Sequence, residues 1–195
     1  MGKIEITKKV LGICATNCYT VVDTETKEAL IIDPADRADV LIRDWKDKGV
    51  TPTAVLLTHG HFDHIGALAG VKKEYPEIRV YAAAEEKEVM ESPALNLSSS
   101  FGAAFTAQAD IYLEDDAEIE VLGRKCKCLL VPGHTKGGMC YYFPEEHVVF
   151  TGDTLFCYSV GRTDFPTGDA KALEDAIREK LFVLPEETLV LPGHD

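Results

Sequence analysis

One short segment of the chain concentrates side chains that bind metal ions. Three imidazoles and one carboxylate fall within six consecutive positions, at His59, His61, Asp63 and His64. The apolar run before them and the amphipathic stretch 65–75 after them predict a buried strand, a loop of ligands and a helix that begins at once. Because side chains alternate along extended backbone, His59, His61 and Asp63 can share a direction. The start of the helix turns His64 another way, so one loop can serve two neighbouring metal ions.

Three further candidates each follow an apolar run and a glycine. They are His134 after Leu129–Gly133, Asp153 after Val148–Gly152 and His194 after Leu189–Gly193. A glycine lets the backbone bend sharply where a side chain must aim at a metal. Two cations roughly 3.5–4 Å apart need a shared anion, which a carboxylate supplies, and a hydroxide between them has a pKa near 7. These side chains therefore predict a hydrolytic site for two metal ions.

The motifs resemble the ligand set of the metallo-β-lactamase-fold hydrolases. The stretch Thr151–Phe156 together with Gly161–Asp164 is most similar to the small glyoxalase II-like branch of that family, and the resemblance runs from Asn17 to the last residue. It implies the α/β (α+β) class and a metallo-β-lactamase-like αββα sandwich, in which two mixed β-sheets carry helices on their outer faces. It also implies that residues 1–195 form one domain.

Carried over position by position, the resemblance assigns a role to each ligand. The first ion is held by His59, His61 and His134, the second by Asp63, His64 and His194, and Asp153 bridges the two. The resemblance implies two zinc ions, and the same ligands also accept iron or manganese. Asp63 has a catalytic role besides, because it can orient the hydroxide and accept its proton.

Arg162, in the turn Gly161–Asp164, is the candidate for substrate binding. Glyoxalase II enzymes carry a basic residue at the matching place, near the carboxylate of the substrate. A guanidinium can hold a carboxylate through two parallel hydrogen bonds. The alternative is an ion pair with Asp164 or Asp169 that serves only the structure.

The function we expect is that of a dinuclear zinc hydrolase of thioesters, with a substrate like hydroxyacylglutathione. The hydroxide attacks the thioester carbonyl, and the zinc ions stabilise the oxyanion. A thiolate leaving group needs little help from a general acid, which fits a sequence in which no additional acid stands out. Glyoxalase II enzymes hold glutathione partly with a helical C-terminal domain, whereas this chain stops at Asp195. We expect either that a short tail is missing or that the substrate is held differently.

Three other functions stay open. An iron(II) persulfide dioxygenase would hold a single iron with His59, His134 and Asp153 as a facial triad. A β-lactamase with two zinc ions uses a Cys where this chain has Asp153, and it is exported. A non-catalytic binding protein on the same scaffold usually lacks ligands, whereas all seven are present here.

Composition restricts the partners and the compartment. A chain of 195 residues, 46% of them hydrophobic, is long enough for one domain with a full core. A net charge of -13 argues against nucleic acid and leaves a small-molecule substrate, and no feature specifies an oligomeric state. Neither an apolar signal segment nor a run near the ~20 residues of a membrane span is present, so we expect a cytoplasmic protein without membrane contact. The six Cys are then reduced thiols.

Hydrophobic periodicity predicts alternating strands and helices. We expect helices at Asp39–Lys48, Ile65–Tyr75, Glu85–Met90 and Ala170–Leu181. The segment Ser92–Ala109 has no clear period and is expected to be a long loop that can include a helical turn. We expect strands at Lys3–Val10, Cys18–Val22, Glu28–Ile32, Ala54–Leu57, Arg79–Ala82, Ile119–Val121, Lys127–Val131, Met139–Phe143, His147–Phe150 and Leu189–Leu191.

Overall fold

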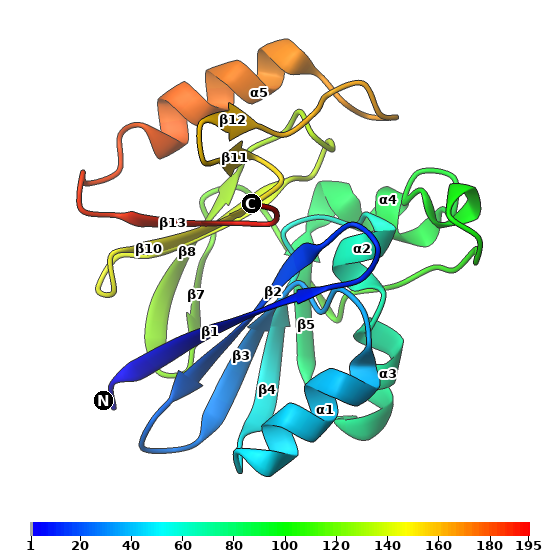
Figure 1. Cartoon of the computed structure of the whole chain (residues 1–195). Helices are drawn as coiled ribbons and strands as arrows, with labels where there is room; N and C mark the ends of the chain where they lie inside the picture. Colours follow the sequence, from blue (N-terminus) through cyan, green and yellow to red (C-terminus); the bar gives the residue numbers. More distant parts are fainter. Residues whose placement is uncertain (1) are drawn as a thin grey trace.

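In the computed structural model, which describes residues 2–195, two β-sheets lie face to face between outer helices (Figure 1). The first sheet has six strands in the order β1 to β6, with β1, β2 and β3 antiparallel and β3 to β6 parallel. Its strands are β1 (Ile4–Leu11), β2 (Thr16–Asp23), β3 (Glu28–Ile32), β4 (Thr51–Leu56), β5 (Arg79–Ala83) and β6 (Ile111–Leu113).

The second sheet has five strands in the order β13-β10-β9-β8-β7. All its neighbours are antiparallel except β13, which runs parallel to β10 and forms an edge. A separate two-stranded hairpin, β11 (Leu155–Phe156) with β12 (Ser159–Val160), follows β10. The strands of the five-stranded sheet are β7 (Glu118–Val121), β8 (Arg124–Leu130), β9 (Met139–Phe143), β10 (Val148–Gly152) and β13 (Leu189–Pro192).

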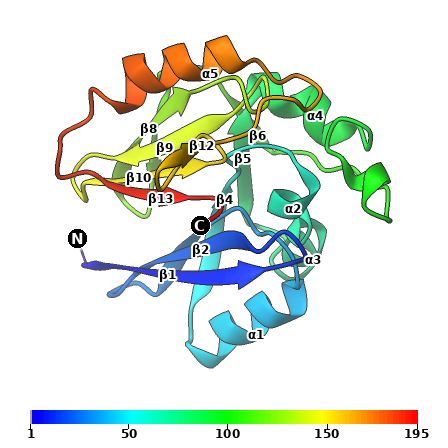
Figure 2. The same ribbon diagram turned by 45° about the horizontal axis from the view of Figure 1, so that its top comes forward.

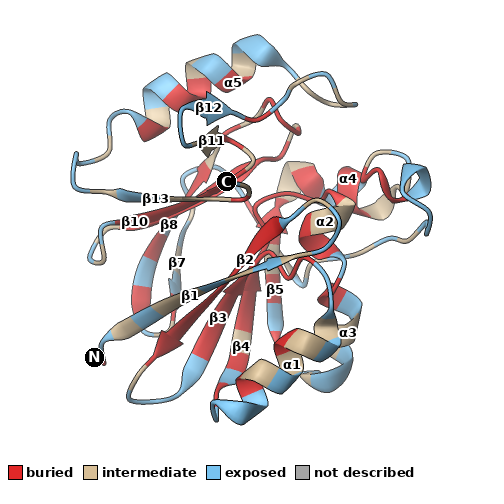
Figure 3. Ribbon diagram, in the orientation of Figure 1, coloured by how far each residue is buried: buried red, intermediate tan, exposed pale blue. Residues whose placement is uncertain are grey.

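Three hydrophobic clusters fill the spaces between four layers. Helices α1 (Ala38–Asp47) and α3 (Leu68–Glu74) cover the first sheet, and α5 (Ala170–Ala176) covers the second (Figures 1 and 2). One cluster lies under α1 and α3, one between the sheets, and one under α5. Figure 3 shows the buried residues concentrated in the strands of both sheets. The layers confirm the predicted α/β sandwich with helices outside.

Successive side chains of a strand point to opposite faces of the sheet, so one sheet contributes to two hydrophobic clusters. On β3, Leu30 and Ile32 belong to the cluster between the sheets, whereas Ile31 belongs to the cluster under the helices. Trp45 of α1 is fully buried in the latter, and its indole N–H donates to the Thr20 hydroxyl at 3.0 Å. A buried side chain of this kind stabilises the fold by about 1.5–3 kcal/mol.

The predicted helix Ile65–Tyr75 is wrong as one continuous element. The chain instead forms α2 (Phe62–Ile65) and then α3, because the N–H of Ala67 donates to the carbonyl of Pro34 at 2.9 Å. A methyl group at Gly66 would lie 2.4 Å from the carbonyl oxygen of Ala35, so the glycine allows this close approach. The break therefore ties the ligand loop to the turn after β3.

Other differences concern short or irregular elements. The sequence analysis gave no strand at β6 and none at β11 or β12, because two or three residues carry too little periodicity. The predicted helix Ala170–Leu181 ends instead in a π-helical turn, Ile177–Leu181. A helix α4 (Lys87–Glu91) follows a 3₁₀ turn at Ala84–Glu86, where one helix was expected. Over residues 2–195, all six Cys are free thiols, as expected.

No helix among the residues that the structure describes is long and apolar enough to cross a bilayer.

Candidate metal centre

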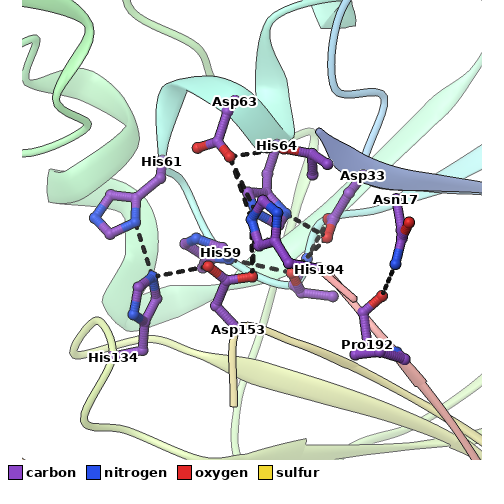
Figure 4. A network of polar contacts seen from close by, with 12 residues as sticks. Asn17, Asp33, His59, His61, Asp63, His64, His134, Asp153, Pro192 and His194 are labelled. Carbon is purple, nitrogen blue, oxygen red and sulfur yellow. Dashed lines mark hydrogen bonds and ion pairs between the residues drawn. The ribbon is translucent and has the colours of Figure 1, made fainter. Parts of the chain in front are cut away.

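The predicted metal ligands converge at one end of the two sheets (Figure 4). The loop after β4 and the start of α2 carry four of them, and the loops after β8, β10 and β13 carry one each. Their ligand atoms form three overlapping groups, within each of which all atoms lie within 4.8 Å of one another. The groups are His59, His61 and His134; His59, His64 and Asp153; and Asp63, His64 and His194.

The first group consists only of imidazoles. Nδ1 of His61 lies 3.0 Å from Nε2 of His134, so two ring nitrogens face each other. Nε2 of His59 and Nε2 of His61 are buried and have no hydrogen-bond partner in the described part of the chain. Buried polar atoms without partners are rare, and convergent nitrogens are what a divalent cation requires. The donor set therefore fits a metal ion.

The group of Asp63, His64 and His194, called the second group from here on, corrects the direction predicted for Asp63. Alternation along extended backbone placed Asp63 with His59 and His61, but α2 already begins at Phe62. The helix therefore turns Asp63 to the same side as His64, and its Oδ2 lies 3.6 Å from Nε2 of His64 and 3.4 Å from Nε2 of His194. This is the grouping that the family resemblance implied.

Asp153 stands between the two groups. Its Oδ1 lies 3.3 Å from Nε2 of His64 and 3.4 Å from Nε2 of His194, while its Oδ2 lies 3.5 Å from Nε2 of His134. A methyl group at Gly193 would lie 2.4 Å from Oδ1 of Asp153, so this glycine allows the close approach of the two loops. One carboxylate thus faces both sets of nitrogens.

Contacts outside the cluster fix the orientation of the ligands. Nδ1 of His64 lies 2.8 Å from Oδ2 of Asp33, and Nδ1 of His134 lies 2.8 Å from the carbonyl oxygen of Arg162. Both acceptors favour a proton on Nδ1 and leave the Nε2 lone pair for a metal. The hydroxyl of Thr16 donates to Oδ2 of Asp63 at 2.7 Å. The sequence analysis did not include Asp33 among the candidate site residues.

Glu86 is a second residue beside the ligands that the sequence analysis missed. It is fully buried, and its Oε1 accepts from the backbone N–H of Gly60 at 2.8 Å while its Oε2 accepts from the hydroxyl of Thr135 at 2.9 Å. Gly60 lies between His59 and His61, and Thr135 follows His134, so one carboxylate joins the two loops of the first group. Burial raises the pKa of Glu86 to about 7, although the donors from Gly60, Thr135 and Gly137 oppose the rise.

The two ligand groups have opposite affinities for protons. Burial lowers the pKa of His61 to about 3, and burial also lowers the pKa values of His59 and His134, so these rings are neutral near pH 7. Burial disfavours a charge on His194 as well, but hydrogen bonds to Asp153 and Asp63 raise its pKa to about 9. The same carboxylates outweigh burial and raise the pKa of His64 well above its usual range. The second group thus already holds positive charge beside its carboxylates.

Arg162 lies at the rim of the cleft above the ligands. A cavity of about 400 Å³ is lined by Arg162 together with His61, Asp63 and Asp153. The guanidinium donates to both oxygens of Asp164, at 2.7 and 2.6 Å, and lies 4.0 Å from the centre of the Phe165 ring. The structure therefore contains the ion pair that was the alternative to substrate binding, and binding of a substrate carboxylate by Arg162 stays a prediction.

Known proteins are similar in sequence to this chain along nearly its whole length. The pattern of the Metallo-beta-lactamase superfamily matches residues 11–194. The chain is 39% identical over 186 residues to the probable metallo-hydrolase YqgX of Bacillus subtilis. The alignment covers 94% of this chain and 87% of that protein. The chain is 35% identical over 184 residues to the hydroxyacylglutathione hydrolase GloC of Haemophilus influenzae, with 91% and 84% covered.

Solved structures also share the fold. The BLEG-1 B3 metallo-beta-lactamase is 39% identical with a TM-score of 0.92, and 98% of this chain and 92% of that chain are covered. TTHA1623 in a di-iron-bound form is 35% identical with a TM-score of 0.83, and 97% and 92% are covered. ETHE1 from Myxococcus xanthus is 30% identical with a TM-score of 0.78, and 98% and 76% are covered.

Proposed function

Because the chain belongs to the metallo-β-lactamase superfamily, we propose that its seven clustered ligands hold two zinc ions and that the protein hydrolyses thioesters. The family and the His/Asp cluster make it a metal-dependent hydrolase. The position of Asp153 between two groups of ligands supports the number of ions, since a shared carboxylate offsets the repulsion of two cations. TTHA1623, with its di-iron-bound form, is a similar protein that accommodates two metals.

The side chains around the ligands suit hydrolysis. When bound, the metal ions lower the pKa of water toward 7 and polarise a carbonyl oxygen. Thr16 and His194 both contact Oδ2 of Asp63, so Oδ1 remains available, among the described residues, to accept a proton. Asp63 also lines the cleft, so its carboxylate is placed to accept the proton of an attacking water.

The scarcity of proton donors favours a thioester. Among the described residues that line the cleft, Cys14 and Arg162 are the only ionisable groups besides the ligands. Burial and the charge of Asp63 raise the pKa of Cys14, and the pKa of Arg162 is raised by Asp164, so neither is suited to protonate a leaving group. A thiolate, with a pKa of about 8.5, leaves without protonation, whereas an amine does not. The similarity to the hydroxyacylglutathione hydrolase GloC supports the same substrate class.

Metal content and turnover test the proposal together. We expect close to two zinc ions per chain in protein purified without added metal, and hydrolysis of S-lactoylglutathione or a neutral acyl thioester. His59→Ala should lose metal and activity. His147→Ala is the matched control, because His147 is exposed and outside the cluster. One iron per chain with no zinc would instead favour the mononuclear dioxygenase.

A second candidate activity is β-lactam hydrolysis. The 39% identity to the BLEG-1 B3 metallo-beta-lactamase favours it. A cephalosporin assayed beside the thioesters separates the two. Hydrolysis of the cephalosporin at a higher kcat/KM than any thioester would replace the thioesterase proposal.

A further inference from the structure

Apolar side chains surround the ligands in the cleft. Four aromatic rings and two aliphatic side chains line the same cavity as the ligands; they are Phe62, Leu97, Phe101, Phe156, Val160 and Phe165. The mechanism described above uses none of them. An apolar wall around a few convergent polar groups is the usual composition of a site that binds small molecules.

The rings are packed against the ligands and against each other. Phe165 lies edge-on to His61, with 5.5 Å between the ring centres, and Phe156 lies edge-on to His194 at 6.2 Å. Phe62 and Phe101 are stacked with their centres 4.5 Å apart and an angle of 19° between the planes. Phe101 is 52% exposed, so the stacked pair presents an apolar surface at the mouth of the cleft. The wall of the cleft beside the ligands is therefore largely aromatic.

The cleft offers little to a substrate with several negative charges. Among the described residues that line it, Arg162 is the only Lys or Arg, and both Nε and Nη2 of its guanidinium already donate to Asp164. A glutathione carboxylate would have to share the single positive charge of Arg162 with Asp164.

We infer that the cleft selects thioesters with an apolar acyl group, such as hexanoyl or phenylacetyl, over glutathione conjugates. This inference rests on the proposed thioester hydrolysis and specifies the substrate class. The acyl chain lies against Phe62 and Phe101 while the thioester carbonyl faces the metal ligands. Burial of an apolar chain against these rings supplies the binding energy that a charged substrate would take from basic residues.

A series of acyl thioesters of one neutral thiol, N-acetylcysteamine, tests the inference with zinc-loaded protein. From acetyl through butanoyl to hexanoyl, kcat/KM should rise about fourfold for each methylene that leaves water. The hexanoyl thioester should exceed S-lactoylglutathione. In Phe101→Ala the ratio of hexanoyl to acetyl turnover should fall roughly tenfold, which corresponds to the loss of a large apolar contact. Phe182→Ala is the matched control, because Phe182 is 65% exposed and does not line the cleft, and it should keep the wild-type ratio.

A binding measurement adds a readout independent of turnover. Titration calorimetry of hexanoate against acetate should give the more negative heat-capacity change for hexanoate, and Phe101→Ala should reduce that difference. Equal kcat/KM values along the acyl series, or S-lactoylglutathione as the best substrate, would overturn the inference while thioester hydrolysis stands. Failure to hydrolyse any thioester would remove the proposed function, and the inference with it.

Discussion

Substitution of Glu86 tests how far the metal centre depends on contacts outside the ligands. Glu86→Gln keeps the shape of the side chain and removes its charge. The glutamine oxygen can still accept from the N–H of Gly60, and the hydroxyl of Thr135 can turn to accept from the new amide. The backbone N–H of Gly137 stabilises the charged form of Glu86 by a hydrogen bond. In Glu86→Gln this N–H would face the amide NH₂ group, which is also a donor. One buried donor is left without an acceptor.

The contacts that Glu86 makes set the expected size of the effect on stability and on zinc binding. A buried donor without a partner costs about 1–3 kcal/mol. Loss of a contact that orients metal ligands typically weakens metal binding 10–100-fold, or about 1.4–2.7 kcal/mol. Because Glu86 joins the loop of His59 and His61 to the loop of His134, part of the cost should appear as weaker zinc binding. We expect a zinc Kd raised at least about tenfold.

Competition with a chromophoric chelator at pH 8 measures that Kd. At this pH the wild-type side chain is the carboxylate, because the pKa of Glu86 is about 7. Glu88→Gln is the matched control, since Glu88 lies two residues further along the chain on α4, is exposed and forms an ion pair with Lys136 at the surface. If Glu86→Gln lowers Tm while its zinc Kd stays within about twofold of wild type, Glu86 supports the fold only and the reasoning is refuted.

Three further predictions concern the charges in the cluster. Asp153→Asn should lose at least one zinc ion by elemental analysis and reduce kcat by roughly 100-fold or more, whereas wild-type zinc content and turnover would contradict a shared carboxylate. Metal-free protein should be most stable to urea near pH 6.5. Below that pH, His61 takes up a proton in the unfolded chain but not in the folded one, where its pKa is about 3. This difference lowers the free energy of unfolding by about 2 kcal/mol at pH 5. Above it, stability should fall as His194 loses its proton near pH 9, so a stability that keeps rising to pH 9 would be inconsistent with the ion pairs. Zinc binding at pH 7.5 should release protons from His64 and His194, and calorimetry in two buffers of different ionisation enthalpy should detect them; a heat independent of buffer would count against this.

The clustering of the seven candidate ligands was predictable because their residue types and spacing are tied to strand ends. Asp33 has the same signal, since it directly follows β3 as Asp153 follows β10, and it could have been found by the same reasoning. Glu86 has no such signal. It stands between Glu85 and Lys87 in a run of charges that normally faces solvent, and only the folded contacts with Gly60 and Thr135 distinguish it.

The layers of the fold and most of its strands were predictable from the sequence. Prediction failed where contacts between elements override the hydrophobic periodicity of a single element. The sequence around Gly66 continues an amphipathic period, yet the Pro34 carbonyl takes the N–H of Ala67 and ends the helix. The direction of Asp63 was mispredicted for the same reason, since the position where α2 begins decides which way its carboxylate points. Periodicity describes one element at a time, whereas these features depend on contacts between elements.

The metal centre also connects the two sheets. The loop of His59–His64 follows a strand of the first sheet, whereas His134, Asp153 and His194 follow strands of the second. Contacts that need no metal already join the sheets beside it: the hydroxyl of Tyr19 and the amide of Asn17, both on β2, donate to the carbonyl of Pro192 on β13, at 2.7 and 3.0 Å. The core between the sheets holds the strand ends at fixed positions, so the ligand nitrogens converge at little further entropic cost. An ion that binds only the folded chain then stabilises the sandwich itself, which links metal occupancy to the packing of the whole fold.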